Sequence, residues 1–152
     1  MADRKFAANT RTSPAASEQE LRELMRRFGA TAMHSGYDQQ TAQQGVFFRV
    51  AGRRYAVTID LPTPAEFRNS PTGRTRTPEA SLAACDQEER RRWRSLVAYI
   101  KALLVAIDDG ILKPEVALLP YALLPDGQRF ADVALPQLDA AEQRVLTDLE
   151  RR

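Results

Sequence analysis

Apolar residues at the start of the chain follow a helical spacing. Ser17 and Glu20 have the spacing of a capping box, and Gly29 supplies a left-handed stop. At about 100° per residue, the large apolar side chains between them share one face. These side chains are Leu21, Leu24, Met25 and Phe28. The pattern predicts a short amphipathic helix that opens at Ser17.

The spacing then changes to the period of a β-strand. Segments 30–37, 46–50 and 53–61 are predicted strands, and the last alternates strictly between apolar and polar positions. Ala51-Gly52 between the second and third strands predicts a hairpin turn. Pro62 ends the pairing, since proline lacks the backbone N–H that a sheet needs.

The longest apolar stripe belongs to a predicted helix over 78–109. Thr77 is expected to cap its start, and Gly110 stops it. The stripe covers an arc of about 120° on a helix of 100° per residue. Its members are Trp93, Leu96, Val97, Ile100, Leu103, Leu104 and Ile107. Since an acidic residue precedes Trp93 in the same arc, we expect the helix before Trp93 to be an exposed overhang or a separate turn.

The C-terminal part predicts a strand over 118–124, a turn at 125–127 and a last helix that opens at Asp139. The whole pattern indicates an α+β fold. A short helix precedes a small antiparallel three-stranded meander, and the long helix packs on that sheet. Residues 1–16 are expected to form a mobile tail and 17–152 a single domain. The basic, proline-rich stretch 62–78 is a long loop, which is typical of functional or disordered segments.

Composition narrows the class of protein. The chain has 152 residues, 43% of them hydrophobic, and a single Cys and a single His. One cysteine, Cys85, excludes a disulfide scaffold, and His34 has no evident nucleophile or acid beside it. Phosphate-loop, dinucleotide, nucleophile-elbow and zinc-protease motifs are absent. We therefore expect no enzyme, no cofactor and no membrane span, and a location in the cytoplasm.

Carboxylates leave one catalytic alternative open, a magnesium-type site without histidine. Asp60 and Glu66 lie six positions apart across a strand end, and Asp108-Asp109 closes the long helix. Their spacing is generic, so the sequence alone does not decide whether they bind a metal.

The charge is unevenly distributed. The net charge is +2. Residues 1–78 contain 12 basic and 7 acidic residues, whereas the rest of the chain contains 10 basic and 13 acidic residues. Arginine suits phosphate contact because its planar fork donates two hydrogen bonds. Nine basic residues are candidates for nucleic-acid contact: Arg49, Arg53, Arg54, Arg68, Arg74, Arg76, Arg90, Arg94 and Lys101. The alternative interpretation is a solvated arginine surface balanced by neighbouring acids.

Three motifs carry a resemblance: FRVAGRRY at 48–55, RWRSLV at 92–97 with IKA at 100–102, and LPDGQ at 124–128. Over residues 20–138 the chain resembles small proteins encoded in phages and prophage regions of bacteria, which implies a phage setting and no particular activity. The order helix, three strands, long helix is also similar to the core of single-strand annealing recombinases. That similarity implies a basic DNA groove between sheet and helix.

Two functions follow as hypotheses. The first is a phage-encoded accessory protein that binds single-stranded DNA, without catalysis, in recombination. The second is a protein-interaction module, such as an inhibitor or adaptor acting on a host or phage protein. Its contact elements would be the tail, the 62–78 loop and the C-terminus. A homo-oligomer is compatible with both, because the apolar runs over 111–135 exceed what one small sheet covers.

Overall fold

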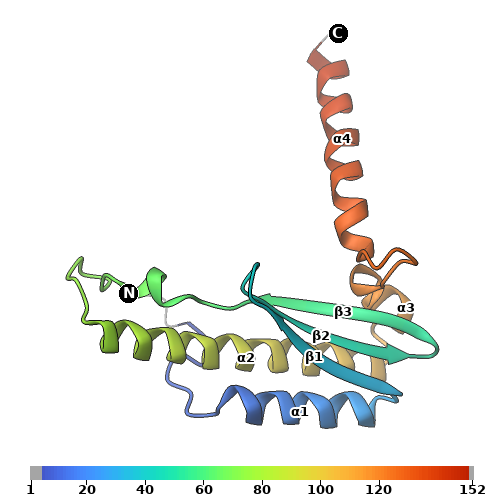
Figure 1. The fold of residues 1–152 in the computed structure, drawn as a ribbon. Helices are drawn as coiled ribbons and strands as arrows, with labels where there is room; N and C mark the ends of the chain where they lie inside the picture. The colour runs from blue at the N-terminus through green and yellow to red at the C-terminus, as the bar shows by residue number, and fades with distance from the viewer. Residues whose placement is uncertain (1–4, 151–152) are drawn as a thin grey trace.

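The structure, a computed structural model, describes residues 5–150 and has an α+β fold (Figure 1). Helices α1 and α2 lie side by side beneath a three-stranded sheet, and helix α4 projects away from this body. The elements in chain order are α1 Pro14–Arg27, β1 Ala32–Asp38, β2 Gln43–Val50, β3 Arg53–Asp60, η1 Pro64–Phe67, α2 Pro78–Asp108, α3 Pro114–Ala117, η2 Leu119–Tyr121 and α4 Phe130–Glu150.

Helix α1 begins earlier than the sequence predicts. Ser13 is its N-cap, with its side-chain oxygen accepting from the Ala16 N–H at 3.1 Å, and Pro14 occupies the first turn. The prediction that Ser17 caps the helix is wrong, because Ser17 is fully buried in the helix interior. Residues 5–13, predicted as part of a mobile tail, lie against α2, where Gln87 Nε2 donates to two of their carbonyl oxygens at 3.0 and 2.9 Å.

The sheet is the predicted antiparallel meander, in the order β1-β2-β3. Ala51 and Gly52 form the turn of the β2–β3 hairpin with φ angles of +47° and +77°. Two positive φ angles match the right-handed twist of the flanking strands, which confirms the hairpin. β2 starts three residues before the predicted Val46, because backbone pairing with β3 extends through polar residues that carry no apolar signal.

The core lies between one face of the sheet and the two long helices. Thr77 caps α2 as predicted, accepting from the Ala80 N–H at 3.2 Å. The helix is continuous through the segment predicted as an overhang, where Ser81 and Cys85 donate to loop carbonyl oxygens. The buried core side chains include Leu21, Met25, Val46, Phe48, Tyr55, Val57, Trp93, Leu96, Val97, Ile100, Leu104 and Leu118. The stripe predicted for the long helix is therefore confirmed as its buried face.

The C-terminal part differs most from the prediction. No strand spans 118–124; the 3-10 turn η2 lies there, directly after the short α3, with isolated bridges at Ala122 and Leu123. Pro120 removes a backbone donor there, which disfavours a strand. The turn is confirmed, with Gly127 at φ +85°. α4 begins at Phe130 rather than Asp139, because its first residues pack on η2 and the helix continues through Pro136.

Candidate nucleic-acid interface

The candidate site lies on the outer face of the sheet, the face turned away from α1 and α2 (Figure 1). Side chains alternate along a strand, so the neighbours of the buried Val46 and Phe48 point outward. Phe47 pairs with His34 of β1, and Arg49 pairs with Arg54 of β3. The strand register thus places an aromatic row and a basic row next to each other.

Two arginines stand directly opposite each other in the basic row. Arg49 and Arg54 are both exposed, and Arg53 follows at the hairpin turn. Among the side chains that the structure describes, no carboxylate forms an ion pair with any of these three. Like charges directly opposite one another destabilise a sheet by up to about 1 kcal/mol. A bound anion between the two guanidinium groups would remove that cost.

The aromatic row is a stacked pair. The rings of His34 and Phe47 lie 4.9 Å apart with an angle of 11° between their planes. Gly45 makes this position possible, since a Cβ there would stand 2.7 Å from Phe47 Cε2. The glycine therefore leaves room for one edge of the phenyl ring above the strand, while the ring stacks on His34.

A hollow of about 330 Å³ opens beside this pair, and we call it the outer hollow. Its walls come from β1, β2, β3 and the turn after η2. The lining residues used below are His34, Phe47, Arg49, Arg54, Leu123 and Gly127. A second, more open hollow adjoins it at the hairpin tip and shares Arg49 and Arg54 with it, with Arg53 and Pro125 on its rim.

The turn at 124–128 is fixed to the sheet by backbone hydrogen bonds. Leu123 N donates to the Arg54 carbonyl oxygen at 2.9 Å, and Leu124 N donates to the Gln128 carbonyl oxygen at 2.8 Å. Asp126 Oδ1 accepts from the Gln128 N–H at 3.0 Å and closes the turn. Two of the three motifs in the sequence, FRVAGRRY and LPDGQ, therefore meet at the outer hollow although about 70 residues separate them.

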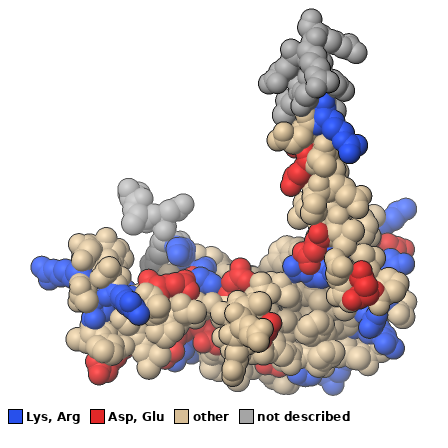
Figure 2. Space-filling model, turned by 45° about the horizontal axis from the view of Figure 1, so that its top comes forward, with Lys and Arg blue, Asp and Glu red and all other residues tan. Residues whose placement is uncertain are grey.

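The loop arginines lie at the other end of the sheet. Arg68, Arg74 and Arg76 follow the end of β3, whereas the outer hollow is next to its start; a strand of eight residues separates these ends by about 23 Å. Arg76 donates to the carbonyl oxygens of Phe67 and Asn69 and thereby holds the loop together. Figure 2 shows basic side chains at both ends of the body rather than in one continuous stripe.

The cations of the long helix lie on the opposite layer. Arg94 forms an ion pair with Glu20 of α1, which holds the pKa of Glu20 below its ordinary value. Lys101 is exposed near the same carboxylate, and Arg90 is half-buried on α2. Since α2 covers the core face of the sheet, these three are separated from the outer hollow. Of the nine predicted contact residues, the structure brings together Arg49, Arg53 and Arg54.

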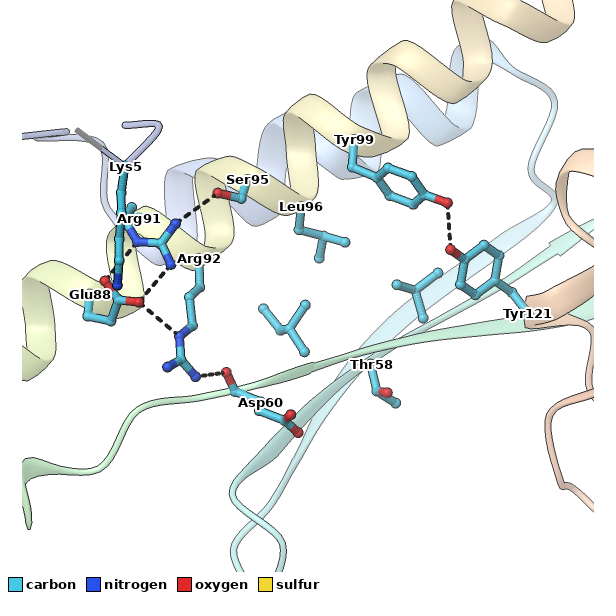
Figure 3. Close-up of a pocket in the computed structure, with 12 residues that line it drawn as sticks. Lys5, Thr58, Asp60, Glu88, Arg91, Arg92, Ser95, Leu96, Tyr99 and Tyr121 are labelled. Atoms are coloured by element: carbon cyan, nitrogen blue, oxygen red, sulfur yellow. Dashed lines mark hydrogen bonds and ion pairs between the residues drawn. The ribbon is translucent and has the colours of Figure 1, made fainter. Parts of the chain in front are cut away.

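The groove between β3 and α2 holds a second basic group (Figure 3). Glu88 accepts from Arg91 at 2.7 Å to each of its oxygens, and from Arg92 at 3.2 Å. These hydrogen bonds lower the pKa of Glu88 to about 2. Arg92 also donates to the Asp60 carbonyl oxygen, which ties α2 to the end of β3. The arginines in the sheet–helix groove are thus engaged within the protein, and Lys5 lies beside the same carboxylate.

Two of the candidate metal-binding carboxylates and the thiol of Cys85 are engaged in other contacts. Glu66 accepts from the backbone and hydroxyl of Thr63, and Asp60 accepts from Gln43. Neither these carboxylates nor Asp108-Asp109 belong to a cluster of three metal-ligating side chains within the described residues. Burial raises the pKa of the Cys85 thiol, which donates to the Pro62 carbonyl oxygen at 3.3 Å. A protonated, buried thiol is a poor nucleophile.

Of the residues that line the outer hollow, Arg49 and Arg54 were predicted as contact residues; His34, Leu123 and Gly127 are among those that were not. His34 lies beside Phe47 on the outer face because of the β1–β2 register, which the sequence does not show. Leu123 and Gly127 reach the site only through the tertiary bridge to β3, for which the sequence has no local signal.

None of the helices in the part of the chain described is long and apolar enough to cross a membrane. Comparison with protein-family models, curated proteins and solved structures finds no match to this chain.

Proposed function

We propose that the protein is a non-enzymatic, phage-encoded accessory protein that binds single-stranded DNA through the outer face of its sheet. The observation that carries this proposal is the cross-strand pair of Arg49 and Arg54, for which no ion pair is found among the described side chains, beside the half-buried Phe47 ring. Arginine forks donate to phosphate oxygens, and an aromatic face stacks on a base. A single strand of DNA exposes phosphates and base faces, and the outer hollow has side chains that can contact both.

The shape of the site favours a single strand over a duplex. In a duplex the base faces are stacked on one another, so an aromatic ring at the protein surface has nothing to stack on. The outer hollow, at about 330 Å³, is at the small end of ligand sites and suits one unstacked base rather than a groove-wide contact. We expect one base to stack on Phe47 while the flanking phosphates contact Arg49, Arg54 and Arg53.

The phage setting rests on the motif resemblance. Two of the motifs that carry it, at 48–55 and 124–128, supply the arginines and one wall of the outer hollow. The annealing-recombinase similarity implies a groove between sheet and helix instead, but the cations there are bound to Glu88. We therefore assign the binding role to the outer face.

The test is a fluorescence-anisotropy titration with a labelled oligothymidine, repeated with single-stranded RNA and with duplex DNA. We expect binding to single strands that weakens between about 50 and 200 mM salt, because bound phosphates release counterions. Arg49→Ala with Arg54→Ala should lower the salt slope by about 1.4, at about 0.7 per phosphate on a single strand.

Matched controls come from the other end of the molecule. Arg68→Ala with Arg74→Ala removes two exposed arginines of the same charge and should leave the affinity nearly unchanged. If the loop pair weakens binding as much as the sheet pair, the outer-face assignment is wrong. If no salt-sensitive binding to any nucleic acid occurs, the DNA-binding proposal fails and the protein-interaction alternative is favoured.

A further inference from the structure

Helix α4 is an arm that stands clear of the body (Figures 1 and 2). Its packing onto the rest of the protein is confined mainly to η2 at its base. Beyond that base, Leu135 is 56% exposed and Leu138 is 58% exposed, and the two lie one turn apart on the same side. Most of the stability of a helix in a protein comes from packing of its apolar face, and Pro136 in the interior of α4 weakens it further. The arm therefore exposes an apolar side that a partner can cover.

The sequence of the arm has the spacing of a helix–helix seam. Ala131, Leu135, Leu138 and Glu142 follow one another at intervals of four, three and four residues. The same spacing continues in the sequence to Val145 and Leu149. This alternation of three and four is the heptad pattern of two packed helices, with one polar residue at the Glu142 position.

The base of the arm adds a second apolar group, where the end of α2, α3 and η2 meet (Figure 1). Its exposed members are Val105, Ile111, Leu112, Val116, Leu119 and Phe130. With the two arm leucines they are eight of the twelve large exposed hydrophobic residues in the described part of the chain. At roughly 60–120 Å² per fully exposed side chain, these partly exposed groups present on the order of 300–500 Å² of apolar surface. That is close to the apolar share of an interface of about 800 Å² per partner.

We propose that the arm pairs in antiparallel orientation with the arm of a second copy of this chain. The spacing in the sequence is symmetric about position 140, so antiparallel pairing sets Leu138 beside the partner's Glu142. The tip of each arm then reaches the apolar base of the other. A two-fold dimer of this kind covers both apolar groups at once, whereas a parallel pair leaves the base groups at one end uncovered by the tips.

The arm is also negatively charged. Residues 130–150 contain five acidic residues and one basic residue. Two such arms repel each other, and salt screens that repulsion. The dimer should therefore become tighter as salt is added, which is opposite to the salt response expected for nucleic-acid binding.

The mass of the full chain should be measured by light scattering coupled to size exclusion, with sedimentation velocity for the dissociation constant. We expect a dimer that Leu135→Asp with Leu138→Asp converts to a monomer. Gln137→Asp with Ala140→Asp, at two exposed positions away from the seam, adds the same two charges and should leave the dimer intact. Glu142→Leu replaces the polar residue of the seam and should tighten the dimer at least about tenfold.

Cysteine cross-linking tests the orientation, because Cys85 is buried. Ala141→Cys lies near the two-fold axis and should form a disulfide-linked dimer under mild oxidation. Ala131→Cys lies far from its copy in an antiparallel pair and should not. Efficient cross-linking at position 131 would overturn the antiparallel arrangement. A wild-type chain that remains monomeric at about 100 μM, with its helical circular dichroism intact, would overturn the dimer itself.

Discussion

Replacing Gly45 by alanine tests the geometry of the outer hollow without touching any charged residue. The new Cβ would stand 2.7 Å from Cε2 and 3.0 Å from Cζ of Phe47. Since carbon atoms pack best at about 3.5–4.0 Å, the ring must move by about 1 Å or swing away from the strand. Either movement breaks the parallel stack with His34 and changes the wall of the hollow.

The effect on folding should be small because two contributions oppose each other. Alanine restricts the unfolded chain more than glycine does and stabilises a strand interior by roughly 0.5–1 kcal/mol. Loss of the His34–Phe47 stack costs roughly 0.5–1.5 kcal/mol. The net change in the free energy of unfolding should therefore stay within about 1 kcal/mol. Binding should lose the stacked base, about 1–3 kcal/mol, which is about a 5- to 150-fold weaker affinity.

Gly36 gives a matched control on the same face. It is the cross-strand neighbour of Gly45, and a Cβ at that position meets no atom within 4 Å. Urea denaturation measures stability, and anisotropy with oligothymidine measures affinity, for Gly45→Ala and Gly36→Ala side by side. Equal affinities for the two variants would refute the inference that the position of the Phe47 ring matters for binding.

Three further predictions concern stability. Glu88 has a pKa of about 2 in the folded state, below its ordinary 4.5, so its ion pairs stabilise the protein fully above pH 4.5 and less as the pH falls toward 2. Wild type should be more stable than Glu88→Gln by at most about 3 kcal/mol at pH 7. Denaturant titrations should show this difference shrinking between pH 4.5 and 2. Ser17 Oγ is buried and has no hydrogen-bond partner, so Ser17→Ala should raise the free energy of unfolding by about 1 kcal/mol, and a loss of stability would contradict this assignment. Trp93 is 3% exposed, and Trp93→Ala should cost about 3–5 kcal/mol by urea denaturation; a cost below about 1 kcal/mol would mean that the core is not built around it.

Where α1 and α4 begin depends on both local capping residues and tertiary packing. Ser13 and Ser17 are both capable N-caps, and only Ser17 has a glutamate three residues later. Packing of α1 on α2 buries Ser17 and engages Glu20 with Arg94, so the helix extends one turn further toward the N-terminus and Ser13 caps it. The same holds for Asp139 and Glu142, whose capping-box spacing lies inside α4 because residues from Phe130 onward pack on η2.

The sequence by itself determined the elements whose signal is local. The stripe of the long helix, the alternation of β3 and the turns at Ala51-Gly52 and 125–127 are set by each residue and its near neighbours, and they form as predicted. Those elements were sufficient to predict the α+β fold class, since the apolar face of a meander must be buried against an amphipathic helix. They were also sufficient to place Arg49, Arg53 and Arg54 at one hairpin.

Tertiary structure alone decided which side chains share a surface. Strand register set Arg49 opposite Arg54 and His34 beside Phe47, and a bridge from Leu123 to β3 brought in a turn about 70 residues away. Charged residues on exposed positions follow no period, so nothing in the chain shows whether the arginines of the hairpin and those of the 62–78 loop share one surface. Their separation by the length of a strand is a property of the folded sheet. Together with the placement of Arg90, Arg94 and Lys101 on the opposite layer, it reduces the nine predicted contact residues to three around the hollow at the hairpin tip, two of which also line the outer hollow.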